Sequence, residues 1–157
     1  MKVVDSFSFF TYFAKEVIFY GTSYWEGDTV IVSLDTDTPC LEWISKGGVM
    51  TDEEFRQSEY VSYDAYLQYK KDYPTLEWFV DARQLRPMDP KDVDWVAKEI
   101  LPKFQEAGLT REAFVIPQNV MAKLAIHQYE TKTTSGQVTV RMFGSVEEAK
   151  QWLKEAH

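Results

Sequence analysis

The stretch from Leu76 to Trp95 constrains the fold more than any other part of the sequence. A short apolar run, Trp78-Phe79-Val80, ends at Asp81, and Asp89-Pro90 begins a long amphipathic pattern after an intervening loop. A continuous apolar run between turn residues predicts a strand covered on both faces, and a helix directly after it predicts a βαβ unit. Ligands of open α/β sheets bind beyond the carboxyl ends of the strands. We therefore expect a site at the loop Asp81–Met88.

Turn and capping residues divide the rest of the chain into further strands and helices. The apolar runs Thr29–Leu34 and Cys40–Ser45 predict an antiparallel hairpin with a five-residue loop. Capping residues predict helices that begin after Thr51, Asp89, Asn119 and Ser145. Further strands are predicted at Val17–Tyr20, which Gly21 should end, at Ala113–Ile116 and at Val138–Phe143. Right-handed crossovers would make the later strands parallel and place helices over the sheet.

Two of these helices carry apolar residues at helical spacing. The residues expected on the buried stripe of the helix after Asp89 are Val93, Val96, Ile100 and Phe104. Pro102 should kink that helix or break it. The residues expected on the apolar face of the helix after Asn119 are Met121, Leu124 and Ala125, with Tyr129 one turn later.

Length and charge favour one globular domain and exclude some partners. We expect residues 1–157 to form a single domain, with 1–28 as an aromatic extension that packs on it or on a second subunit, as in a homodimer. The net charge of −8 and the scattered basic residues argue against nucleic acid. The sequence has no run of about 20 apolar residues and no signal peptide, which favours a soluble, cytoplasmic protein.

Residue types that support metal binding, cofactor binding or catalysis are sparse. Cys40 is the single cysteine, which we expect in a buried strand, and His127 and His157 are the two histidines. We therefore expect neither a cysteine- nor a histidine-based metal site, and Asp35 and Asp37 lack the spacing of a calcium loop. No glycine-rich phosphate loop is present, and we expect no cofactor. His127 leaves a small hydrolase as a minor hypothesis.

The best candidate contact residues lie near the loop after the central strand. Asp81 and Arg83 could contact a ligand or partner, or they could pair with each other. Arg86 has the same two options, since acidic residues of the next helix are close in sequence. Asn119 is either a ligand group or, more simply, a helix cap.

Three tryptophans could line an apolar pocket beneath that loop. These are Trp43, Trp78 and Trp95. The large apolar area of tryptophan makes a place in the core the more common outcome.

Several motifs together carry a resemblance to a known family. They are Trp43, Met50–Arg56, Val80–Arg83, Asp94-Trp95, Ala113–Pro117 and Phe143–Ala149. From about Thr29 to Leu153, the chain resembles the SpoIIAA-like, or STAS, family, and in particular a bacterial subgroup described as STAS/SEC14-like. The resemblance implies an α/β fold of two or three layers, with an N-terminal antiparallel hairpin and later parallel strands joined by helices.

The resemblance also implies functions, which we state as expectations. Members of the family act as regulatory interaction modules or hold small, often apolar, ligands. In the anti-anti-sigma branch a serine in the turn after the central strand is phosphorylated, but Pro90 or Lys91 stands at that place here. No phosphorylation site is therefore carried over.

Three functional hypotheses follow from the sequence. The first is a non-enzymatic STAS-like module that binds an unknown protein partner or a small molecule at the C-terminal edge of the sheet. The second is a carrier for a small apolar, lipid-like molecule. The third is a small hydrolase.

Overall fold

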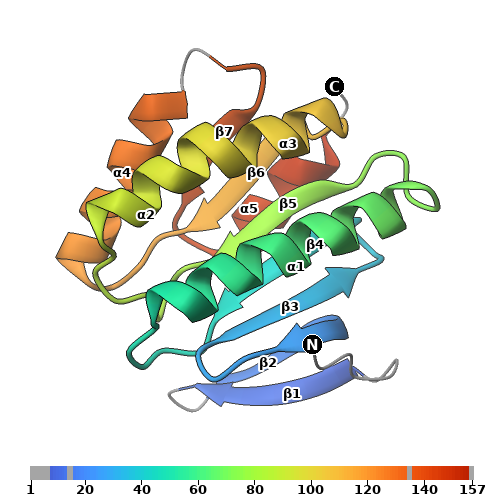
Figure 1. Ribbon diagram of the computed structural model, residues 1–157. Helices are drawn as coiled ribbons and strands as arrows, with labels where there is room; N and C mark the ends of the chain where they lie inside the picture. The colour runs from blue at the N-terminus through green and yellow to red at the C-terminus, as the bar shows by residue number, and fades with distance from the viewer. Residues whose placement is uncertain (1–7, 14–15, 134–135, 156–157) are drawn as a thin grey trace.

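A seven-stranded mixed sheet, in which the strands follow one another in chain order, organises the protein (Figure 1). The computed structural model describes residues 8–13, 16–133 and 136–155. The strands are β1 (Ser8–Phe13), β2 (Glu16–Glu26), β3 (Val30–Asp35), β4 (Cys40–Ser45), β5 (Glu77–Asp81), β6 (Arg111–Val115) and β7 (Thr139–Phe143). Strands β1 to β4 pair antiparallel, and β4 to β7 pair parallel. The hairpin and the later parallel strands are therefore confirmed.

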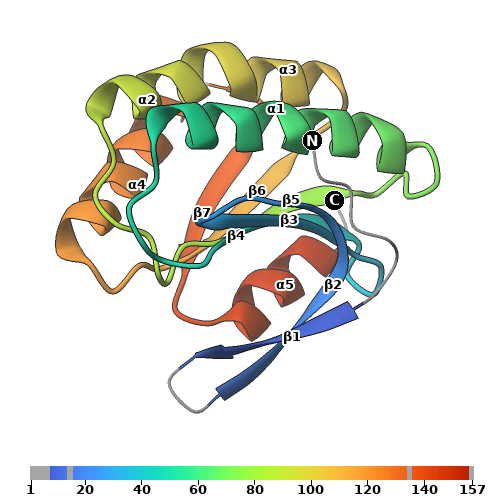
Figure 2. The same cartoon turned by 60° about the horizontal axis from the view of Figure 1, so that its bottom comes forward.

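Helices cover both faces of this sheet, which gives three layers (Figure 2). The helical segments are α1 (Asp52–Lys70), α2 (Pro90–Trp95), the π-helical turn η1 (Val96–Ile100), α3 (Leu101–Glu106), α4 (Val120–Thr133) and α5 (Val146–Lys154). Helix α5 packs alone against one face, with Ala149 and Leu153 on Phe79. The other helices pack on the opposite face, where the larger apolar core lies. The α/β fold class predicted from the sequence is confirmed.

Strand β5 lies in the middle of the parallel part of the sheet, as its sequence predicts. All five of its residues are buried. Successive side chains of a strand point to opposite faces, so Trp78 and Val80 contribute to the larger core, whereas Phe79 contributes to the core under α5. A strand buried on both faces accounts for the uninterrupted apolar run.

The sequence-based boundaries were wrong in the second strand and slightly wrong in the hairpin loop. Gly21 does not end a strand, because β2 continues through it to Glu26. A Cβ atom at this position would collide with the carbonyl of Leu34, so glycine permits close approach of the neighbouring strand. In the hairpin, Asp35 pairs with Cys40, which leaves a four-residue rather than a five-residue loop.

The predicted interruption at Pro102 takes the form of a π-helical turn. The backbone N–H of Leu101 bonds to the carbonyl of Val96 at the end of η1. Proline has no N–H to donate and its ring clashes with the preceding turn, and a local π turn relieves both problems. The buried stripe of Val93, Val96, Ile100 and Phe104 is confirmed.

The predicted face of α4 was partly wrong. Met121 and Leu124 are 63% and 44% exposed, whereas Ala122 and Ile126 are buried beside Ala125 and Tyr129. The sheet therefore contacts a stripe shifted by about one position along the helix. The side chains of residues 1–20 lie outside what the structure describes, so the packing of residues 1–28 and the single-domain division stay predictions.

Candidate ligand pocket

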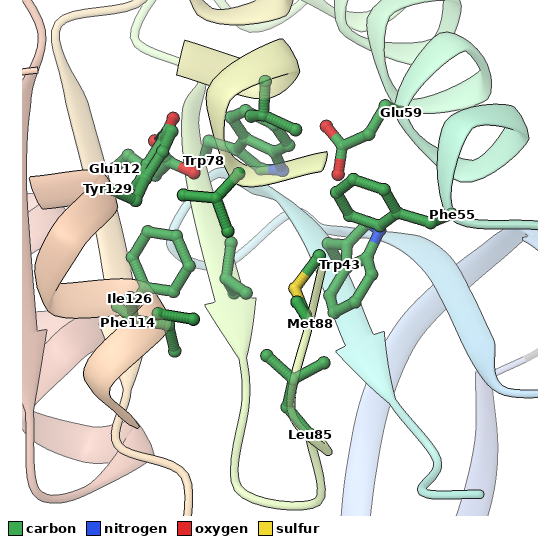
Figure 3. Close-up of a pocket in the computed structure, with 14 residues that line it drawn as sticks. Trp43, Phe55, Glu59, Trp78, Leu85, Met88, Glu112, Phe114, Ile126 and Tyr129 are labelled. Carbon is green, nitrogen blue, oxygen red and sulfur yellow. Dashed lines mark hydrogen bonds between the residues drawn. The ribbon is translucent and has the colours of Figure 1, made fainter. Parts of the chain in front are cut away.

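A small cavity of about 60 Å³ lies between the parallel strands and the helices α1, α2 and α4 (Figure 3). Its walls are mainly apolar and aromatic. Trp43, Trp78 and Phe114 come from three neighbouring strands, Phe55 from α1 and Ile126 from α4. Because these residues belong to elements far apart in the sequence, the cavity exists only in the folded chain.

Two buried carboxyl groups also line this apolar cavity. Glu59 on α1 is 4% exposed and Glu112 on β6 is 1% exposed. The hydroxyl of Tyr129, on α4, donates a hydrogen bond of 2.8 Å to Oε2 of Glu112. Figure 3 shows both acids pointing toward the space between the sheet and the helices.

Two polar atoms of this pocket have no hydrogen-bond partner. They are Oε2 of Glu59 and the indole nitrogen of Trp78, both buried. Trp43, in the same wall, differs: its indole nitrogen donates to Oγ of Ser58 at 2.9 Å. An unpaired buried polar atom costs about 1–3 kcal/mol, so native proteins rarely leave one without a reason.

Burial shifts the proton equilibria of both acids. It raises the pKa of Glu112 to about 8, although the hydrogen bond from Tyr129 opposes this change. It raises the pKa of Glu59 well above its ordinary value, and the nearby Glu112 adds to that effect. Glu112 therefore favours the protonated form near neutral pH, and burial shifts Glu59 in the same direction.

No basic side chain is present among the described residues that line the cavity. Its titratable groups are Glu59, Glu112 and Tyr129, all of which are acids. The cavity therefore combines aromatic walls with acidic groups and no positive counter-charge. This combination repels anions and accepts either neutral or positively charged groups.

A wider hollow of about 300 Å³ adjoins the cavity at the C-terminal edge of the sheet. Phe55, Leu85 and Met88 line both spaces, so these three side chains separate the inner cavity from the outer hollow. Leu85 and Met88 belong to the loop after β5, where the sequence predicts a site. The outer hollow is more polar and includes Arg86 and Asp92.

Asp81 and Arg83 pair with each other at this edge. Nε of Arg83 donates to Oδ1 of Asp81 at 3.0 Å, and a terminal nitrogen donates to Oδ2 at 2.7 Å. The side chain of Asp81 is 3% exposed and that of Arg83 is 25% exposed. This pairing holds the start of the loop in place, and neither residue lines the cavity. Arg86 lines the outer hollow instead.

The remaining predicted residues lie in three different places. Trp43 and Trp78 line the cavity, but Trp95 packs outside it, with its ring edge-on to Phe55 at 6.2 Å. Asn119 caps α4, since its side-chain oxygen accepts hydrogen bonds from the N–H groups of Met121 and Ala122.

His127 lies away from the cavity. Its side chain is 67% exposed, and Nδ1 is 3.6 Å from Oε2 of Glu130 on the same helix. Within the described residues, no cluster of three or more His, Cys, Asp or Glu side chains is placed to hold a metal ion.

Sequence reasoning missed the two acids of the cavity and the tyrosine that binds one of them. A usable signal was present in α1, where Glu59 follows Phe55 by four residues and precedes Tyr66 by seven, so it shares their buried face. Glu112 likewise lies two positions before Phe114 in β6, so both side chains point to the same face of the sheet. An acidic residue with the same spacing as the buried apolar residues of its helix or strand therefore indicates a buried acid.

Comparison with known proteins gives one match. A family model described as SpoIIAA-like matches residues 42–154, a range that includes the cavity and the loop above it. The comparisons with curated proteins and with solved structures gave no match. None of the helices that the structure describes has the length and apolar character needed to cross a membrane.

Proposed function

The chain belongs to the SpoIIAA-like family, and on that premise we propose that it is a regulatory module which binds a small molecule in the cavity beneath the loop after β5. Membership of the family indicates a regulatory or interaction module. The small molecule is the finer proposal. In it, the polar end of the ligand enters the inner cavity and its body occupies the outer hollow at the C-terminal edge of the sheet.

The observation that carries this proposal is the pair of unpaired polar atoms inside an apolar cavity. Glu59 and Trp78 each leave a buried polar atom without a partner. Protein cores are normally close-packed and their polar groups hydrogen-bonded. A ligand that fills the cavity and bonds to either atom would remove the cost at that atom.

The size of the cavity favours a small polar end over a whole lipid. An apolar cavity of about 150 Å³ is enough to bind benzene. The inner cavity of about 60 Å³ holds a group of only a few heavy atoms unless Leu85 and Met88 move. A lipid-like molecule would have to place most of its chain outside, so the carrier hypothesis receives less support.

The test is to fill the cavity and measure what the protein retains. Ala125 lines the cavity from α4, so Ala125→Leu should reduce its volume. Gln128→Leu adds a similar apolar group to the exposed side of the same helix and serves as the matched control. Native mass spectrometry of gently purified protein, followed by denaturing extraction, measures the bound molecule.

We expect a small molecule on the wild type and on Gln128→Leu, and loss of it from Ala125→Leu. A bare wild-type protein that also binds nothing from a panel of small amines, alcohols and acids would overturn the proposal. Equal retention by Ala125→Leu would place the ligand elsewhere.

Binding of a protein partner at the same edge is a second candidate, supported by exposed apolar side chains. Val49, Val120 and Met121 follow the C-terminal ends of β4 and β6, and they are 77%, 75% and 63% exposed. Met121→Ser should weaken a defined partner complex, whereas Leu67→Ser, at a 41% exposed position on α1, should not. Equal effects of the two changes on a pull-down would contradict a contact at this edge.

A further inference from the structure

We infer that the ligand is a linear alkylamine whose ammonium group enters the inner cavity and donates hydrogen bonds to Glu59. The chain would leave between Leu85 and Met88 into the outer hollow. This inference rests on the proposed function, because it names the class of molecule that the same pocket would bind.

The lining of the cavity carries acidic groups without basic ones among the described residues. The described residues around the cavity contribute two carboxyl groups, Glu59 and Glu112, and no lysine, arginine or histidine. A ligand with a carboxylate or phosphate would therefore bring a third acidic group into an apolar space. An ammonium group instead supplies the missing positive charge, and a charge pair in such a space also gives stronger hydrogen bonds.

Aromatic side chains make up much of the cavity wall. Trp43, Phe55, Trp78, Phe114 and Tyr129 surround the two acids. Aromatic rings attract cations within about 6 Å through their negative faces, and tryptophan does so best. Acids and aromatic rings together, without bases, favour an organic cation over a neutral alcohol of the same size.

One carboxylate oxygen of Glu59 is available to a ligand. The Oε2 atom is buried and has no partner, and Figure 3 shows this side chain reaching between Trp78 and Phe55 into the pocket. An ionised Glu59 carboxylate only accepts hydrogen bonds and an ammonium group only donates them, so the two are complementary. Glu112 already accepts from Tyr129, so Glu59 is the acid with the open position.

The shape of the two connected spaces favours a linear chain. The inner cavity of about 60 Å³ is large enough for the amine and its first carbons, whereas the outer hollow is about 300 Å³. Phe55, Leu85 and Met88 lie between the two spaces and provide apolar contact for a methylene chain. A bulky ring next to the amine would not fit without movement of these side chains.

Binding of an amine requires a proton to leave the pocket. Burial raises the pKa of Glu59 and so favours its protonated form, and the groups that face it are the acids Glu112 from β6 and Tyr129 from α4. When a protonated amine enters, Glu59 gives up its proton to the solvent, and the ammonium–carboxylate pair remains. One proton is therefore released for each amine bound, and affinity should increase with pH while Glu59 is protonated.

The experiment is calorimetry with three probes that share one chain. n-Hexylamine, 1-hexanol and hexanoate are titrated at about pH 7 into the wild type, Glu59→Gln and Glu53→Gln. Glutamine keeps the size of Glu59 and removes its charge, so the fold is retained. Glu53 lies exposed on the same helix and provides the matched control.

We expect hexylamine to bind the wild type at least about tenfold more tightly than the other probes. Glu59→Gln should weaken hexylamine binding by at least about tenfold and leave hexanol within about twofold. Heats measured in two buffers with different ionisation enthalpies should report about one proton released by the wild type and none by Glu59→Gln. Glu53→Gln should behave as the wild type does.

Two results would contradict an amine as the ligand but would still be consistent with binding of a small molecule in the pocket. One is binding of hexanol or hexanoate as tightly as hexylamine, and the other is unchanged hexylamine affinity in Glu59→Gln. If none of the probes binds but a molecule that Ala125→Leu loses is extracted from the wild type, the amine is again wrong and the proposed function holds. If no probe binds and the wild type is bare, both fail.

Discussion

Glu42 and Glu59 are buried acids on opposite faces of the sheet, and of these two only Glu42 has a positively charged partner among the described residues. Under α5, Glu42 is 1% exposed, and Nζ of Lys150 donates to it at 2.6 Å and to Asp35 at 2.7 Å. The other oxygen of Glu42 accepts from Oγ of Ser33 and from the N–H of Gly21. On the opposite face, Glu59 leaves one oxygen unpaired.

The proton equilibria differ in the same way. Burial alone would lower the pKa of Lys150, but Glu42 and other acidic groups outweigh it and raise the pKa. For Glu59 and Glu112, burial dominates and no basic group opposes it. Burial of an acid therefore does not by itself identify a ligand-binding site. A fully paired acid stabilises the fold, whereas an unpaired acid beside a cavity is suited to a ligand.

The largest expected effect on stability is that of removing the cation that α5 contributes, Lys150. Lys150→Met would leave Glu42 and Asp35 without their shared partner, and removal of one member of a buried ion pair costs about 3–5 kcal/mol. Urea unfolding should show a decrease of that size in the free energy of unfolding. Lys154→Met, at an exposed position of the same helix, should change it by less than about 0.5 kcal/mol. Equal effects of the two variants would contradict a structural role for the network.

The next largest effect is a dependence of the free energy of unfolding on pH, caused by an acid on the face of the sheet that carries the cavity. The pKa of Glu112 is about 8 in the folded protein, against an ordinary value of 4.5. Its contribution to stability is therefore fully present below about pH 4.5 and is lost as the pH rises toward 8. The free energy of unfolding should fall by up to about 1.4 kcal/mol for each pH unit in this window.

The control for this slope is Glu112→Gln, which keeps an oxygen that can accept from Tyr129. Urea unfolding at about pH 5, 6.5 and 8 should give a shallower slope for the variant than for the wild type. Identical slopes would show that Glu112 is not held protonated by its surroundings.

A smaller difference in stability is expected between substitutions at two alanines, one on each face of the sheet. Ala149 on α5 is fully buried against Phe79 and Trp152, and Ala149→Leu should overpack this core and cost about 1–3 kcal/mol. Ala125→Leu should cost less, because the new side chain can enter the cavity. Thermal unfolding of both variants checks the order. A greater loss for Ala125→Leu would mean that the cavity cannot take the added atoms.

The fold was largely predictable because local signals mark its elements. The apolar run of β5 and the caps at Thr51, Asp89 and Ser145 each depend on residues a few positions apart. The errors arose where a distant contact decides the outcome. Gly21 permits close approach of β3, and the buried stripe of α4 depends on the strand beneath it.

The site was only partly predictable for the same reason. The loop with Leu85 and Met88 follows from the position of β5, and Trp43 and Trp78 were identified as pocket candidates. Asp81 and Arg83 were candidate contact residues with mutual pairing as the alternative, and they do pair with each other. Glu59 and Glu112 are 53 positions apart in the sequence, so only the folded chain shows that they share a cavity.

The most direct test of the difference between the two faces uses the five tryptophans as reporters. Each indole N–H gives its own signal in a two-dimensional ¹H–¹⁵N NMR spectrum, which Trp→Phe variants assign. Trp78 and Trp43 line the cavity, whereas Trp152 belongs to α5 on the opposite face. We expect hexylamine to shift the signals of Trp78 and Trp43 saturably and to leave that of Trp152 unchanged. An unmoved Trp78 signal, or a Trp152 signal that shifts equally, would contradict a binding site on the face that carries Glu59.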